Sequence, residues 1–133
     1  DGCHTPMVWN ENQSNGGFSL ANKTWLPIKE AQLSRAVSAQ GENSVLEFYR
    51  KMIKLRRAEE ELRIGKTKFL DLPEPVLGYT RGKKFICIFN LSSKTVTIDL
   101  PIKIEPLLKQ QVDFKGNKIK FKANGFVIGA YTN

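Results

Sequence analysis

Asp1-Gly-Cys-His-Thr-Pro-Met-Val-Trp9 is the stretch of nine residues that decides how this chain folds. Neither a helical nor a strand period runs through it. It combines a glycine suited to a tight bend, a rigid Thr5-Pro6 pair and two large apolar anchors, Met7 and Trp9. This combination predicts a structured loop that is pressed onto something larger. Because the chain begins inside this loop without any lead-in, we expect it to be the tail of a longer protein.

Residues 1–42 are predicted to be largely irregular. A polar, turn-rich run occupies residues 10–17, and a short helical turn is expected at residues 31–36. A structureless stretch of this length is normally functional or packed on a neighbour. Burying an aromatic side chain stabilises a protein by roughly a few kcal/mol. Trp9, Phe18 and Trp25 are therefore expected to need a surface that the chain itself does not supply.

Three further blocks follow the opening stretch, and they are Gly16-Gly-Phe-Ser19, Trp25-Leu-Pro27 and the run from Ser44 to Arg56. Together these blocks resemble, in order and approximate spacing, the α-glucosidases and oligo-1,6-glucosidases of the α-amylase superfamily, glycoside hydrolase family 13. In bacterial α-glucosidases of that family the opening stretch reads D-G-C-R-T-P-M-P-W. The resemblance covers about the first half of the chain, and the second half matches only in pattern.

The resemblance implies an α+β fragment with two parts. Residues 1–65 would be the C-terminal end of the catalytic (β/α)8 barrel, made of an active-site-rim loop and the last barrel helix. Residues 66–133 would be an all-β C-terminal domain with an antiparallel β-sandwich fold.

The clearest helix is predicted over residues 44–63. Ser44 is a good N-cap, and Glu47 three residues later completes a capping box. Spacings of three and four residues place most of the apolar side chains on one face. Gly65 is expected to end the helix in the left-handed conformation.

From Lys66 onward the pattern turns to strands. The runs 76–80 and 84–91 bracket Arg81-Gly82-Lys83 and predict a hairpin. Residues 85–89 are apolar at every position, as in a central strand that is covered on both faces. Residues 95–100 and 118–122 alternate, so one face of each is expected to be buried. With a final strand at 125–131, and with Pro101 and Pro106 at edges or turns, six or seven short strands predict an antiparallel sandwich.

No catalytic residue is expected in this chain. Retaining glycosidases use two carboxylates, one as nucleophile and one as general acid. The resemblance places these two residues and a third, stabilising aspartate on earlier barrel strands, upstream of Asp1. The run Glu59-Glu60-Glu61 is interpreted as a solvated helix end. The chain alone is therefore predicted to be non-catalytic, although its parent resembles a retaining α-glucosidase.

His4 is the candidate substrate-binding residue, because it stands where the family's motif has arginine. The resemblance places that arginine at the active-site rim, where it helps to hold the sugar. An imidazole cannot reproduce the fixed fork of donors of a guanidinium. Two interpretations stay open: an altered substrate contact with weakened activity, and a neutral change in a loop. His4 is also the chain's single histidine, and Cys3 and Cys87 lack metal-ligand spacing, so no metal and no cofactor is expected.

The net charge of +8 raises the question of nucleic acid, but the basic residues are dispersed and no RNA-binding signature accompanies them. No apolar run approaches the roughly 20 residues that span a bilayer. We expect neither a nucleic-acid partner nor a membrane partner, and a cytoplasmic location. The expected partners are the missing N-terminal (β/α)8 barrel and, for the whole enzyme, a small α-glucosidic oligosaccharide.

Two alternative functions remain. The first is a non-catalytic interaction subunit, because the heavy subunits of amino-acid transporters have similar tails and His4 replaces arginine. The second is a stand-alone carbohydrate-binding β-module. Its candidate sugar-stacking residues are Trp9, Trp25, Tyr79 and Tyr131.

Overall fold

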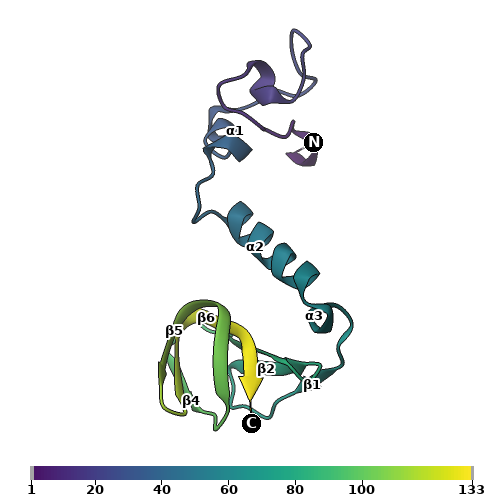
Figure 1. The fold of residues 1–133 in the computed structure, drawn as a ribbon. Helices are drawn as coiled ribbons and strands as arrows, with labels where there is room; N and C mark the ends of the chain where they lie inside the picture. The colour runs from purple at the N-terminus through teal and green to yellow at the C-terminus, as the bar shows by residue number, and fades with distance from the viewer. Residues whose placement is uncertain (1, 133) are drawn as a thin grey trace. The chain divides into compact units, whose positions relative to one another are not determined.

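The computed structural model describes residues 2–132, and the chain divides into two compact units at residues 55 and 56 (Figure 1). The first unit is mostly irregular, as predicted. Its short elements are the 3-10 turns η1 (Gly2–His4), η2 (Ser14–Gly17) and η3 (Val37–Ala39) and the single-turn helix α1 (Glu30–Leu33). The expected helical turn near residues 31–36 is confirmed by α1.

The predicted helix over residues 44–63 is in fact two helices, α2 (Val45–Ala58) and α3 (Glu60–Ile64). The Ser44 cap is confirmed, because the Glu47 N–H donates to Ser44 Oγ at 3.2 Å. Glu59 interrupts the helix with an extended backbone, at φ −108° and ψ 110°. The expectation for Gly65 was wrong, since its φ of −59° is not left-handed.

Position 65 requires glycine because neighbouring backbone atoms leave no room for a side chain, and not because of its backbone angles. A Cβ at this position would lie 2.4 Å from the Glu61 carbonyl oxygen and 2.8 Å from the Gly82 nitrogen. Both neighbours are backbone atoms that cannot move aside cheaply. The end of α3 therefore contacts the turn at Gly82, although residues 66–81 separate the two in sequence.

The second unit is a single antiparallel sheet with the order β1-β2-β3-β6-β4, in which β5 also pairs with β6. Its strands are β1 (Thr67–Phe69), β2 (Val76–Arg81), β3 (Phe85–Asn90), β4 (Val96–Asp99), β5 (Lys103–Lys115) and β6 (Lys118–Thr132). The predicted hairpin is confirmed by the pairing of β2 with β3, and Gly82 in its turn has a φ of +60°.

The sheet curls over and encloses a core, which confirms the predicted sandwich-like fold. One half of β6 pairs with β4 at residues 118–121, and the other half pairs with β3 at residues 126–130. β5 runs along both halves, and both long strands are seen to bend in Figure 1. Side chains from both halves meet in the core, and they include Ile86, Ile88, Ile98, Ile119, Phe121 and Val127.

Strand β5 was missed, because Pro101 before it and Pro106 within it were interpreted as marks of a connection. Pro106 lies inside β5, at a register shift between Pro106 and Leu108. β5 pairs with β6 alone, so Pro106 occupies an edge strand, where a missing N–H is tolerated. The central position of β3 is confirmed, with Phe85 to Ile88 all buried.

Candidate functional site

The loop that carries His4 is built around the buried side chain of Val8. The Val37 N–H donates to the Val8 carbonyl at 3.2 Å, and the Ser38 N–H donates to the Trp9 carbonyl at 3.0 Å. Ala36, just before this contact, is fully buried. The opening stretch is therefore pinned to a segment that is distant in sequence, as a structured loop requires.

A tight turn at Gly16 completes the loop. The Trp9 and Asn10 N–H groups both donate to the Gly16 carbonyl, at 2.8 and 3.0 Å. Gly16 has a φ of +59°, and a Cβ there would lie 2.9 Å from Cγ1 of Val8. Only glycine meets both conditions, because L side chains disfavour this φ and the space is already filled.

Glu11 ties the same two segments together through its side chain. The Ser38 hydroxyl donates to the Glu11 carboxylate. This hydrogen bond lowers the pKa of Glu11 from its usual value, and a backbone hydrogen bond contributes in the same direction. The carboxylate is therefore favoured in its ionised form at the point where the loop closes.

His4 lies at the end of η1 with an exposed side chain. The residues that follow it line a hollow of about 260 Å³, together with Gln32 and Arg35 from the end of the α1 region. Arg35 is a guanidinium close to the opening stretch that sequence reasoning missed. It is so far from Thr5 in sequence that no local pattern connects the two residues.

Several large apolar side chains of the first unit are exposed. Trp25 is 95% exposed and Trp9 is 53% exposed, and Met7, Phe18 and Leu20 are exposed as well. Helix α2 contains no buried residue, and Tyr49 on it is 63% exposed. Within the described residues of the first unit, therefore, no other part of that unit covers these apolar groups.

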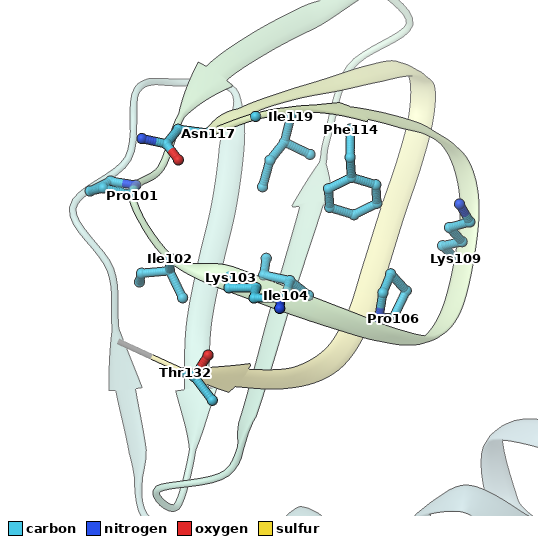
Figure 2. Close-up of a pocket in the computed structure, with 11 residues that line it drawn as sticks. Pro101, Ile102, Lys103, Ile104, Pro106, Lys109, Phe114, Asn117, Ile119 and Thr132 are labelled. Atoms are coloured by element: carbon cyan, nitrogen blue, oxygen red, sulfur yellow. The ribbon is translucent and has the colours of Figure 1, made fainter.

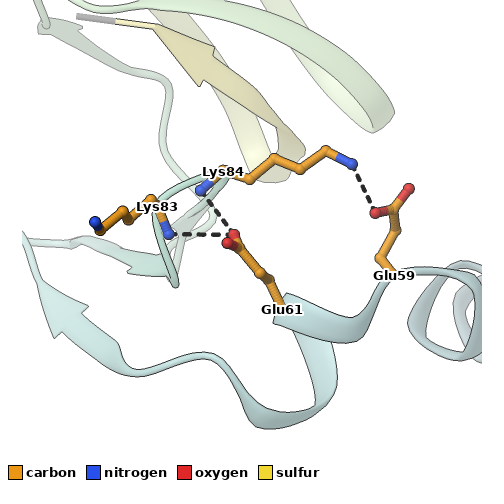
Figure 3. Close-up of polar contacts among 4 residues, drawn as sticks. All are labelled: Glu59, Glu61, Lys83 and Lys84. Atoms are coloured by element: carbon orange, nitrogen blue, oxygen red, sulfur yellow. Dashed lines mark hydrogen bonds and ion pairs between the residues drawn. The ribbon is translucent and has the colours of Figure 1, made fainter.

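In the second unit, Glu61 joins α3 to the β2–β3 turn. Its Oε2 accepts the backbone N–H of Lys83 at 3.1 Å and of Lys84 at 2.8 Å, and the Lys84 ammonium pairs with Glu59 at 2.7 Å (Figure 3). We call these contacts the Glu61 joint. They correct the interpretation of the glutamate run as solvated, since among the three glutamates Glu60 alone is exposed.

The sugar-stacking candidates of the second unit, Tyr79 and Tyr131, pack against other side chains of the β-domain. Tyr79 belongs to a row of rings across four strands, with ring centroids 6.0 Å from those of Phe69 and Phe89, and Phe89 lies 6.1 Å from Phe126. Tyr131 packs against the hydrophobic core. Trp9 and Trp25 in the first unit are exposed, as described above.

Cys87 is buried, and Cys3 is exposed, and both thiols are free. Burial raises the pKa of the Cys87 thiol, although its hydrogen bond with Tyr79 acts in the opposite direction. Burial likewise raises the pKa of the Tyr79 hydroxyl. Burial and a raised pKa both disfavour the reactive thiolate of Cys87, in agreement with the inert thiol that its apolar strand predicts.

Neither unit shows a metal site or a membrane span among its described residues. No group of three or more histidine, cysteine, aspartate or glutamate side chains is placed to hold a metal within residues 2–132. None of the helices in that range combines the length and the apolar character that crossing a bilayer requires.

A family model described as the α-amylase catalytic domain matches residues 1–65. Among curated proteins, a probable α-glucosidase from Rhizobium meliloti is 42% identical over 113 residues, covering 80% of this chain and 20% of the relative. An oligo-1,6-glucosidase from Parageobacillus thermoglucosidasius is 32% identical over 109 residues, covering 76% of this chain and 19% of the relative. The chain thus spans about a fifth of the length of these relatives.

Solved structures also match this chain as one part of a larger enzyme. A crystal structure of an α-glucosyl transfer enzyme matches with a TM-score of 0.79 and 30% identity, covering 100% of this chain and 26% of that chain. An isomaltulose synthase from Klebsiella sp. matches with a TM-score of 0.73 and 26% identity, covering 96% and 25%. The described fold therefore occurs as about a quarter of larger enzymes.

Proposed function

The chain belongs to the α-amylase family, glycoside hydrolase family 13, and on this premise we propose that it is the C-terminal part of a retaining α-glucosidase. The whole enzyme would cleave terminal α-glucosidic bonds of small oligosaccharides. The names of the two curated relatives, an α-glucosidase and an oligo-1,6-glucosidase, support this substrate class.

Within this proposal, residues 1–65 complete the barrel and residues 66–133 form the C-terminal β-domain. The end of the family-model match at residue 65 supports this boundary. The nucleophile and the general acid that retention requires belong to the barrel that precedes this chain. The chain alone is then non-catalytic, and its partner is that barrel.

The observation that carries the proposal is the uncovered apolar surface of the loop and of α2. Side chains as large as Trp9, Trp25 and Tyr49 would each stabilise a protein by roughly 1.5–3 kcal/mol on burial. A barrel wall is a surface of the required kind, since the outer faces of such barrels are formed by packed helices.

His4 is proposed to lie at the rim of the substrate pocket of the whole enzyme. Its exposure, and its position beside a loop held rigidly at Val8 and Gly16, support this role. Arg35 lines the hollow next to Thr5, and its guanidinium is a cation that can contact a sugar hydroxyl from the same rim.

The proposal is tested by the size and the activity of the protein in its source organism. An antibody against residues 66–133 should detect a protein several times heavier than this chain. The purified protein should hydrolyse maltose or isomaltose with retention, whereas the 133-residue chain should not. The proposal would be refuted if the source organism makes a protein no larger than this chain. It would also be refuted if the longer protein has no α-glucosidase activity.

One observation favours a second candidate, a non-catalytic interaction subunit. The family's arginine is replaced here by His4, which lacks the fork of a guanidinium. The substitution His4→Arg in the longer protein separates the two candidates. A gain in glucosidase activity would support the enzyme, and a complete lack of activity in both forms would favour the interaction subunit.

A further inference from the structure

A hollow of about 770 Å³ opens in the β-domain, far along the chain from the loop of His4. Strand β5 curves round it, as Figure 2 shows. Its volume falls within the range of roughly 300–1,000 Å³ that small-molecule sites occupy. The hollow lies entirely in the second unit, so an inference about it is independent of the proposed glucosidase function.

The lining of the hollow is mainly apolar. Of its 11 residues, six are apolar, namely Pro101, Ile102, Ile104, Pro106, Phe114 and Ile119. In Figure 2, Phe114 and Ile119 extend from one arm of the curl toward Ile104 and Pro106 on the other. Ile119 is a buried member of the core, and Phe114 is 37% exposed. The hollow is therefore a part of the core edge that remains open to a ligand.

The charged groups of the hollow all have one sign. Lys103 and Lys109 line it, and no aspartate or glutamate is among its lining residues. The Lys109 ammonium lies 5.5 Å from the centroid of the Phe114 ring, which places a cation directly above the apolar wall. An anion that enters beside Lys109 meets no carboxylate of the lining.

We propose that this hollow binds a small monoanionic amphiphile, a molecule with an apolar body and one carboxylate or sulfate group. The apolar body would lie against Ile104, Phe114 and Ile119, and the anionic group would pair with Lys109. A sugar fits the lining less well, because among the described residues Asn117 and Thr132 are its only neutral polar side chains. Sugar recognition needs more hydrogen-bonding groups than these two residues provide.

Calorimetry with decanoate, below its micelle-forming concentration, tests the proposal on the full 133-residue chain. Decanoate should bind saturably, and decanol, which has the same body without the charge, should bind about tenfold more weakly, as the loss of one charge-assisted contact predicts. Lys109→Met keeps the apolar stem and removes the charge, so it should weaken decanoate binding about tenfold.

Lys120→Met is the matched control, because Lys120 is an exposed lysine of β6 outside the hollow, and it should leave the affinity unchanged. Methyl NMR locates the site, since Ile102, Ile104 and Ile119 should shift on titration. Three results would each overturn the proposal. The first is an equal loss of decanoate affinity in both lysine variants, and the second is a set of NMR shifts confined to the exposed loop of the first unit. The third is binding of maltotriose or anionic vesicles without binding of free decanoate.

Discussion

Replacing Glu61 should loosen the attachment of α3 to the β2–β3 turn. The Glu61 carboxylate accepts two backbone N–H groups, at 3.1 and 2.8 Å. A hydrogen bond to a charged group contributes about 1.5–3 kcal/mol when it is shielded from water. Lys83 and Lys84 are exposed, so water can replace the lost acceptor in part. We therefore expect about 1 kcal/mol for each bond, which is below that range because water competes for the donors at this exposed position.

The expected loss of unfolding free energy is then about 2 kcal/mol for Glu61→Ala and about 1 kcal/mol for Glu61→Gln, because glutamine retains a neutral acceptor. Urea unfolding followed by the far-ultraviolet signal of the sheet measures this loss. With a slope of roughly 1–3 kcal/mol per molar urea, the alanine variant should unfold about 1 M earlier.

Glu60→Ala is the matched control for this experiment. Glu60 has the same chemistry and is the neighbouring residue in α3, but it is exposed. Its loss should change the unfolding free energy by less than about 0.5 kcal/mol. If Glu61→Ala and Glu60→Ala unfold at the same urea concentration, the two N–H contacts do not stabilise the domain and the reasoning fails.

Three further substitutions or modifications follow from the same structure. Gly65→Ala should cost about 1–3 kcal/mol through its clash with backbone, whereas Gly41→Ala, with no atom within 4 Å of the new Cβ, should be nearly neutral in the same urea assay. Asn90 is 2% exposed and its amide donates to two carbonyls at 2.7 and 2.9 Å, so Asn90→Ala should cost about 2–3 kcal/mol in thermal unfolding. Iodoacetamide should alkylate Cys3 in the folded protein and Cys87 only after unfolding, since Cys87 is buried and its pKa is raised; peptide mass spectrometry that finds equal labelling would contradict this.

Local patterns predicted the elements whose signals lie close together in sequence. The cap at Ser44, the apolar run of β3 and the turn at Gly82 each depend on a few consecutive residues, and the structure confirms all three. The strand β5 was missed because it contains Pro106, which is read locally as a break. Only its place at the edge of the sheet, beside β6, makes a proline acceptable there.

The candidate site was predictable to a smaller extent. The opening stretch was recognised as a structured loop, and its contacts with residues 36–38 agree with that interpretation. Arg35 and the role of Glu61 were missed for one common reason, which is that each meets its neighbours across a long stretch of sequence. Arg35 lines a hollow with Thr5, and Glu61 accepts hydrogen bonds from the turn between β2 and β3. A charge run looks the same in sequence whether its carboxylates face water or cap a distant turn.

The apolar stripe of α2 raises a different question. Its sequence has the spacing of an amphipathic helix, but none of its residues is buried. A helix of 14 residues is marginal in water by itself, and most helices in proteins are stabilised by packing of one face. Yet no residue of α2 is buried, and Val45, Tyr49 and Ile53 are all exposed. A sequence that forms a cap and an apolar stripe, but leaves Val45, Tyr49 and Ile53 exposed within the first unit, has a face that is available to pack on another surface. The same reasoning applies to Trp9 and Trp25, and it is the physical basis of the proposal that a barrel is the partner of this chain.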